Sequence, residues 1–198
     1  MLRIIADSTC DISKEDARKM GIQIVPISVR FGNEEFLDGV EITHEEFYTR
    51  LAECDELPKT SQPSPDTFMK VFNEAVAAGD DVLGIFISSD LSGTYQSACL
   101  AALDVEEETG KKLYMVDSRS ASIGTALLIR EAVKLRDAGV RTELVSVAEG
   151  KALEEYLAFG KNQGAEGILY LDGENVTVYD MASGDQETKT LQEFREEY

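Results

Sequence analysis

The alternation of short apolar segments with longer helical segments is the feature that most limits what this chain can fold into. Over residues 1–140, the short segments are rich in β-branched residues, and the longer ones repeat their apolar residues with a helical period. The expected strands are residues 2–6, 22–31, 82–87 and 113–116. This order is typical of βαβ units, so we expect an α/β fold, a parallel sheet with helices on both faces.

Capping residues mark the ends of the expected helices. Hydroxyl N-caps occur at Ser13, Thr43 and Ser64, and stop glycines at Gly21, Gly79 and Gly139. The helices that follow are residues 13–21, 43–53, 64–79, 92–103 and 123–138. Pro26 lies inside the second expected strand and predicts a bulge or an edge position there.

The last part of the chain has a different pattern. A helix is expected over residues 143–159, and apolar alternation on both sides of Asp172-Gly173-Glu174-Asn175 predicts a β-hairpin of residues 167–171 and 176–179. Residues 190–197 are expected to form a short terminal helix. We therefore expect residues 1–140 to form the main α/β domain and residues 141–198 a reduced α+β domain.

The formal net charge of −19 limits the partners of this protein. Such a surface repels nucleic-acid backbones and anionic lipid headgroups, so we expect no nucleic-acid binding. Attachment to a basic protein partner stays open, as does the simpler interpretation that the charge keeps the protein soluble.

Cysteine spacing and hydropathy predict the compartment. Cys10, Cys54 and Cys99 are odd in number and form no CxxC pair, which favours reduced thiols over a disulfide framework. No apolar segment approaches the ~20 residues of a membrane span. The opening segment reaches Asp7 too early to be a signal peptide. We expect a soluble, cytoplasmic protein.

Small polar residues follow three of the expected strands. They are Asp7-Ser8-Thr9, Ser88 through Thr94, and Asp117-Ser118-Arg119-Ser120. Ligands of open α/β sheets bind outside the carboxyl ends of the strands, and parallel neighbouring strands bring such clusters to one edge. The sequence thus predicts a ligand-binding rim, although each cluster alone is also explained by helix capping.

The segment around Gly93 is the best candidate for an anion site. Gly93 lets a ligand approach the backbone, and the N–H groups that open the following helix lie at its positive end. The hydroxyl of Ser92 or Thr94 adds a donor, so a carboxylate or a phosphate suits this position. No Gly-x-x-x-x-Gly-Lys-Ser/Thr motif occurs, so the segment is not a P-loop.

A second polar segment, Thr60-Ser61-Gln62-Pro63-Ser64-Pro65, carries three hydroxyls and two prolines. One interpretation is a helix cap and nothing more. The other is a stiff loop that places its donors over a ligand at the rim.

Catalytic and metal-binding patterns are sparse. His44 is the only histidine and lies in the capping-box segment, and no Gly-x-Ser-x-Gly elbow occurs. No Cys/His spacing fits zinc, and a Rossmann phosphate fingerprint is absent. Asp7 and Asp117 suit either a shared divalent cation or two helix caps. We expect a binding protein without a cofactor, not an enzyme.

Several motifs, in order, resemble one known family. They are Ile4 through Ile12 (IIADSTCDI), Ile24-Val25-Pro26-Ile27, Thr60 through Pro65, Ile87 through Ala98 (ISSDLSGTYQSA), Val116-Asp117-Ser118 and Gly124. Each is weak alone, but the ordered set resembles the DegV family.

This resemblance implies a protein that encloses one long-chain fatty acid, with the carboxylate at the mouth and the acyl chain in an apolar tunnel. The best-understood members of the family present the acid to a separate kinase, which makes the acyl phosphate. Carried over by position, Thr60 or Ser61 and Ser92 are the carboxylate donors, with the Gly93 amide. Asp7, Ser8 and Ser118 shape the rim.

The second half departs from the family pattern. The family's Leu-x-x-Leu-x-x-Gly-Gly-Arg segment is reduced here to Leu153 through Gly160, so the chain looks internally shortened. A tunnel with a missing wall predicts a shorter acid, weak binding, a wall borrowed in a homodimer, or no ligand.

The candidate lining residues are Ile27, Val29, Phe31, Leu91 and Tyr95, each also explained as plain core. The alternative function is a lipid-free interaction or regulatory protein, and an enzyme using the polar rim is a third.

Overall fold

The computed structural model describes residues 1–139, 157, 161, 167–172, 175–190 and 193. The chain divides into two compact units, Met1–Val140 and Arg141–Tyr198, which are described separately.

A parallel sheet forms the centre of the first unit. Its strands are β1 (Leu2–Asp7), β2 (Ile22–Val25), β6 (Asp81–Phe86) and β7 (Leu113–Asp117), in the order β2-β1-β6-β7. All three neighbouring pairs are parallel. The predicted α/β class is confirmed. Because β2 and β6 lie on opposite sides of β1, the sheet has a topological switch point at the carboxyl end of β1.

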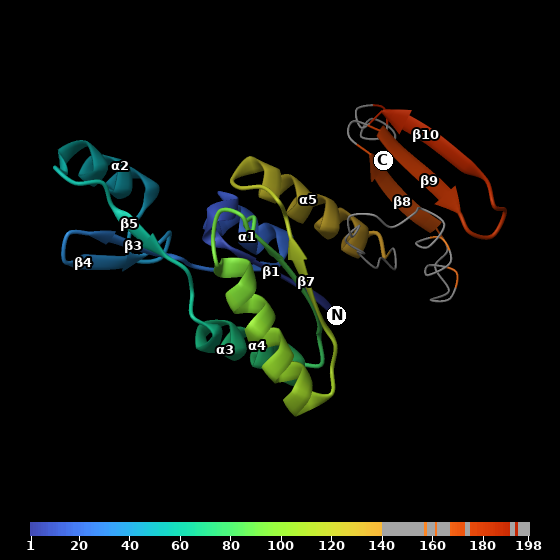
Figure 1. Ribbon diagram of the computed structural model, residues 1–198, viewed down its shortest axis with the longest axis horizontal. Coiled ribbons are helices and arrows are strands. Elements are labelled where there is room, and N and C mark those ends of the chain that lie inside the picture. Colours follow the sequence, from blue (N-terminus) through green and yellow to red (C-terminus); the bar gives the residue numbers. More distant parts are fainter. Residues whose placement is uncertain (140–156, 158–160, 162–166, 173–174, 191–192, 194–198) are drawn as a thin grey trace. The chain divides into compact units, whose positions relative to one another are not determined.

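Helices cover both faces of this sheet (Figure 1). On one face α3 (Pro65–Ala77) and α4 (Thr94–Thr109) pack with Ile5 of β1 into one buried cluster. On the other face α1 (Lys14–Met20) and α5 (Ile123–Asp137) pack with Ile4 into a second cluster. Successive residues of β1 thus serve opposite cores, as expected for a buried parallel strand.

A small antiparallel sheet also belongs to this unit. Its strands are β3 (Ser28–Phe31), β4 (Glu34–Leu37) and β5 (Lys59–Ser61), in the order β4-β3-β5. Helix α2 (His44–Glu53) packs Phe47 against Phe31, with 5.6 Å between ring centroids.

The single strand predicted over residues 22–31 is wrong. The segment forms β2 in the parallel sheet and β3 in the antiparallel sheet, with Pro26 between them. Proline has no N–H to donate to a strand ladder, and the N–H of Ile27 instead donates to Ser8 Oγ at 3.2 Å. The apolar segment therefore passes from one sheet to the other.

The predicted caps are confirmed. Ser13 Oγ accepts from the Asp16 N–H at 3.0 Å. Thr43 and Glu46 form a reciprocal capping box, with bonds of 3.2 and 2.8 Å. Helix α4 starts at Thr94, later than expected, and continues to Thr109, past the predicted end.

The described part of the second unit is an antiparallel sheet in the order β10-β9-β8. The predicted hairpin is confirmed as β8 (Gly167–Asp172) and β9 (Asn175–Asp180). Strand β10 (Gln186–Thr190) was not expected. The helices predicted over residues 143–159 and 190–197 fall largely outside the described residues. None of the described helices has the length and apolar character to cross a membrane.

Candidate functional site

The three polar clusters predicted from the sequence meet at the carboxyl ends of the parallel strands. The Ile87 N–H, just after β6, donates to Asp7 Oδ2 at the end of β1, at 2.9 Å. The Ser88 N–H donates to the Ser120 carbonyl oxygen of the loop after β7, at 2.8 Å. These bonds join the loops that follow β1, β6 and β7 into one continuous rim.

Asp7 and Ser8 stabilise this rim by accepting hydrogen bonds from neighbouring residues. Asp7 is fully buried, and its carboxyl also accepts from the Thr9 N–H at 2.9 Å and from the Thr9 hydroxyl. Ser8 Oγ holds the N–H of Ile27. Both oxygens of Asp7 are therefore occupied by protein donors, which agrees with a role in shaping the rim.

Asp117 caps the neighbouring loops in the same way. Its carboxyl accepts from Ser89 Oγ at 2.5 Å and from the Arg119 N–H at 2.9 Å. Burial alone would raise the pKa of the Asp117 carboxyl, but the bonds from Ser89 and Arg119 outweigh it and lower the pKa. Across the described residues, no group of three or more His, Cys, Asp or Glu side chains is arranged to hold a metal. Asp7 and Asp117 each accept protein hydrogen bonds at both carboxyl oxygens, which agrees with the capping interpretation.

Asp117 is expected to stabilise the fold above about pH 4. Its pKa is lower in the folded than in the unfolded protein. As the pH falls toward these pKa values, the unfolded state therefore binds more protons than the folded state. The free energy of unfolding should therefore fall more steeply for the natural protein than for Asp117→Asn between about pH 5 and pH 2. Urea denaturation at each pH measures this, and equal slopes would contradict it.

The first turn of α4 brings hydroxyl and backbone N–H groups together. Gly93 is its N-cap and supplies no side-chain hydrogen bond to the helix. Ser92 is half-buried, and its hydroxyl lies 2.9 Å from the hydroxyl of the buried Thr94 and 3.3 Å from the Thr94 N–H. The N–H groups that open this helix point to a position where an anion is stabilised.

Thr60 and Ser61 lie on β5 of the antiparallel sheet, next to a residue that contacts α4. Both are exposed on β5, opposite Val29 and Ser28 of β3. The next residue, Gln62, donates from Nε2 to Ser97 Oγ of α4 at 2.9 Å. A hydrogen bond thus connects the residue after Thr60 and Ser61 to helix α4, which begins just after Ser92 and Gly93.

The structure gives local roles to two further polar residues singled out by the sequence. Ser118 Oγ donates to the Ser120 carbonyl oxygen at 3.0 Å and lies 3.1 Å from Thr125 Oγ1, so it braces the start of α5. His44 is an exposed first-turn residue of α2.

The predicted tunnel residues divide into two groups. Val29 and Phe31 belong to the buried cluster under α2, which agrees with plain core. Ile27 and Tyr95 are half-buried, and Leu91 is 68% exposed. Only these last three offer apolar surface to a ligand.

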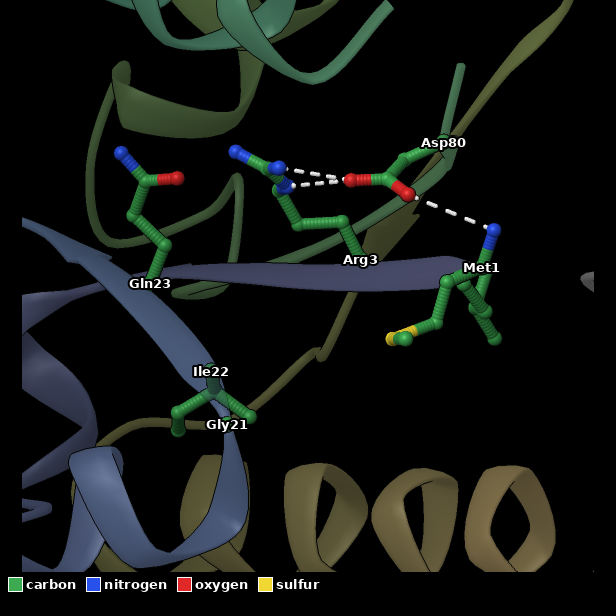
Figure 2. A pocket seen from close by; sticks show the side chains of 7 residues that line it. Met1, Arg3, Gly21, Ile22, Gln23 and Asp80 are labelled. Carbon is green, nitrogen blue, oxygen red and sulfur yellow. Dashed lines mark hydrogen bonds and ion pairs between the residues drawn. The ribbon is translucent and has the colours of Figure 1, made fainter. Parts of the chain in front are cut away.

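A pocket of about 300 Å³ lies at the end of the sheet opposite the rim (Figure 2). It is lined by Met1, Leu2, Arg3, Gly21, Ile22, Gln23 and Asp80. Arg3 Nη2 pairs with Asp80 Oδ2 at 2.6 Å, so the main charges of this pocket neutralise each other. It stands at the amino ends of β1 and β2, away from the rim.

The comparison with protein families decides where this chain belongs. A model described as "Uncharacterised protein, DegV family" matches residues 1–155. The chain belongs to the DegV family. A DegV domain-containing protein of Clostridium perfringens is 40% identical over 142 residues, which are 72% of this chain and 50% of that protein. One of Caldanaerobacter subterraneus is 35% identical, over 73% of this chain and 51% of that protein. This DegV chain thus spans about half the length of the curated relatives it matches.

Solved structures, two of them described as DegV proteins, have the same fold. A stearic acid-binding protein of Eubacterium ventriosum has a TM-score of 0.66 and 28% identity, over 96% of this chain and 70% of that chain. DegV of Bacillus subtilis, described as a fatty acid binding protein, has a TM-score of 0.65 and 28% identity, over 71% and 49%. A fatty acid-binding DegV protein of Thermus thermophilus has a TM-score of 0.61 and 27% identity, over 98% and 76%.

Proposed function

We propose that this DegV protein binds a long-chain fatty acid and holds its carboxylate at the first turn of α4. The observation that carries the proposal is the set of solved relatives described as fatty-acid-binding, each above 25% identity. The hydroxyl and N–H donors at the first turn of α4 support the same ligand class.

In this proposal the carboxylate accepts from the Ser92 hydroxyl, the Gly93 N–H and a hydroxyl of Thr60 or Ser61. The positive end of a helix as long as α4 favours an anion there. Repulsion from the net charge of −19 is screened over about 8–10 Å in physiological salt, so the local donors dominate. The acyl chain runs over the apolar surface of Ile27, Leu91 and Tyr95.

The finer part of the proposal is that the protein acts as a carrier, or as a subunit that presents the acid to a partner kinase in the cytoplasm. The sequence has no P-loop, so phosphorylation of the bound carboxylate is assigned to the partner. The acidic surface suits a partner with a basic docking face.

Replacing Ser92 by alanine is expected to weaken fatty-acid binding roughly 10- to 100-fold, because a hydrogen bond to a charged group is lost. Titration calorimetry of delipidated protein with stearate measures the affinity. Thr109→Ala is the control: it removes a hydroxyl from the other end of α4, bonded to the Val105 carbonyl oxygen, and should leave the affinity unchanged. An unchanged affinity for Ser92→Ala would contradict the site assignment.

Native mass spectrometry of the purified protein, followed by organic extraction, tests the ligand class. A stoichiometric fatty acid is the expected result. One observation favours the alternative, a lipid-free interaction protein: the exposed Leu91 and Ile123, 68% and 73% exposed, also suit a protein partner. Protein that carries no lipid and takes up no added stearate would support that alternative.

A further inference from the structure

The side chain of Gln62 lies in the space next to Gly93. Gly93 has φ −76° and ψ 4°, which any residue adopts, so its backbone does not require glycine. A Cβ placed there would lie 2.2 Å from Gln62 Oε1 and 2.7 Å from Gln62 Nε2. The carboxamide of Gln62 therefore occupies the space that a side chain at Gly93 would need.

A second contact secures the same carboxamide. Gln62 Nε2 donates to Ser97 Oγ at 2.9 Å, and the Ser97 side chain is buried. The Ser97 N–H in turn donates to the Gly93 carbonyl oxygen at 3.0 Å. These contacts connect the residue after β5, Gln62, to Gly93 and Ser97 in the first turn of α4.

This junction connects two parts of the fold that no strand pairing joins directly. β5 lies in the antiparallel sheet, whereas α4 packs on the parallel sheet. Ser61 immediately precedes Gln62, so its Cα lies about 3.8 Å from that of Gln62. The bond from Gln62 to Ser97 therefore restrains the end of β5 that carries Thr60 and Ser61.

We propose that Gln62 is a positioning residue for the carboxylate site. It keeps the β5 hydroxyls near the donors of α4 before the ligand binds. Binding of the acid then loses less conformational entropy, because the site is already ordered. The inference rests on the proposed function and assigns a role to a residue that need not touch the ligand. In this role Gly93 leaves room for the Gln62 carboxamide, in addition to offering its N–H to the ligand.

The test is a double-mutant cycle of Gln62→Ala and Gly93→Ala, with stearate affinity measured by calorimetry on folded, delipidated protein. Each single variant should bind roughly 10-fold more weakly, because each breaks the bond to Ser97. The double variant should bind no more weakly than either. Gln23→Ala, on β2 at the opposite edge of the sheet, is the matched control and should bind as the natural protein does.

Hydrogen exchange of the amides of β5, without ligand, gives a readout that is independent of lipid binding. Gln62→Ala should speed exchange at Thr60 and Ser61, and Gln23→Ala should not. If the natural protein binds no stearate, the proposed function is wrong. Amide hydrogen exchange at Thr60 and Ser61 then tests by itself whether Gln62 positions β5. Normal affinity or normal exchange for Gln62→Ala overturns the inference, as does a Gly93→Ala effect that persists in the Gln62→Ala background.

Discussion

Replacing Asp7 by alanine is expected to lower the free energy of unfolding by about 3 kcal/mol, because a buried donor loses its acceptor. The Asp7 side chain is fully buried, and its Oδ2 is the acceptor of the Ile87 N–H at 2.9 Å. Alanine leaves that N–H without a partner at a place that water does not reach. It also releases the Thr9 N–H and hydroxyl. The loops after β1 and β6 lose the bond that joins them.

Urea denaturation followed by circular dichroism measures this change. Asp7→Asn keeps the shape and one acceptor oxygen but turns an NH₂ group toward a protein donor, so we expect it to recover only part of the loss. Asp104→Ala, an exposed position on α4, should change stability by less than about 0.5 kcal/mol. A loss below about 1 kcal/mol for Asp7→Ala would show that the rim does not depend on this carboxyl.

Replacing Phe68 by alanine is expected to lower the free energy of unfolding by about 4 kcal/mol. Phe68 of α3 is fully buried, with its ring centroid 5.8 Å from that of Phe72 and 5.2 Å from that of Phe86 on β6. The variant loses the transfer free energy of the ring and leaves a cavity between helix and sheet. Both neighbouring rings lose part of their contact surface.

Phe68→Leu separates the cavity from the loss of the aromatic ring. It refills most of the volume, so we expect it to cost less than about 1.5 kcal/mol. Tyr48→Ala is an exposed aromatic control, since its side chain on α2 is 66% exposed. A Phe68→Ala protein with the stability of the Tyr48→Ala protein would mean that this core repacks around the gap.

Local sequence signals are sufficient to predict much of the fold. Ser13 and Thr43 cap the helices they were expected to cap, because a capping bond depends on a few neighbouring residues. The predicted end of α4 near Leu103 is wrong, because the helix continues to Thr109, just before Gly110, a glycine stop signal that adopts φ 70°. The meeting of the strand-end clusters was predictable once the strands were taken as parallel.

Long-range contacts explain what the sequence did not reveal. Residues 22–31 form one continuous apolar segment, and only the two sheets, formed by distant parts of the chain, divide it at Pro26. Strand β10 has no apolar alternation, and its place comes from pairing with β9. Gln62 meets Ser97 across 35 positions of sequence, and no local pattern marks such a bond. The ligand roles of the rim residues, and the division into domains at residue 140, stay predictions.

Two pairs of hydroxyls, in the rim and on β5, differ in their evolutionary freedom. Thr94 and Ser118 have protein partners for their hydroxyls, so their loss costs the fold whatever the ligand is. Thr60 and Ser61 stand exposed on β5, where a substitution costs the fold little. Selection can therefore change what the rim holds without rebuilding the sheet beneath it. A lineage of such proteins can exchange one carboxylate for another, or lose its ligand, while it keeps the same architecture.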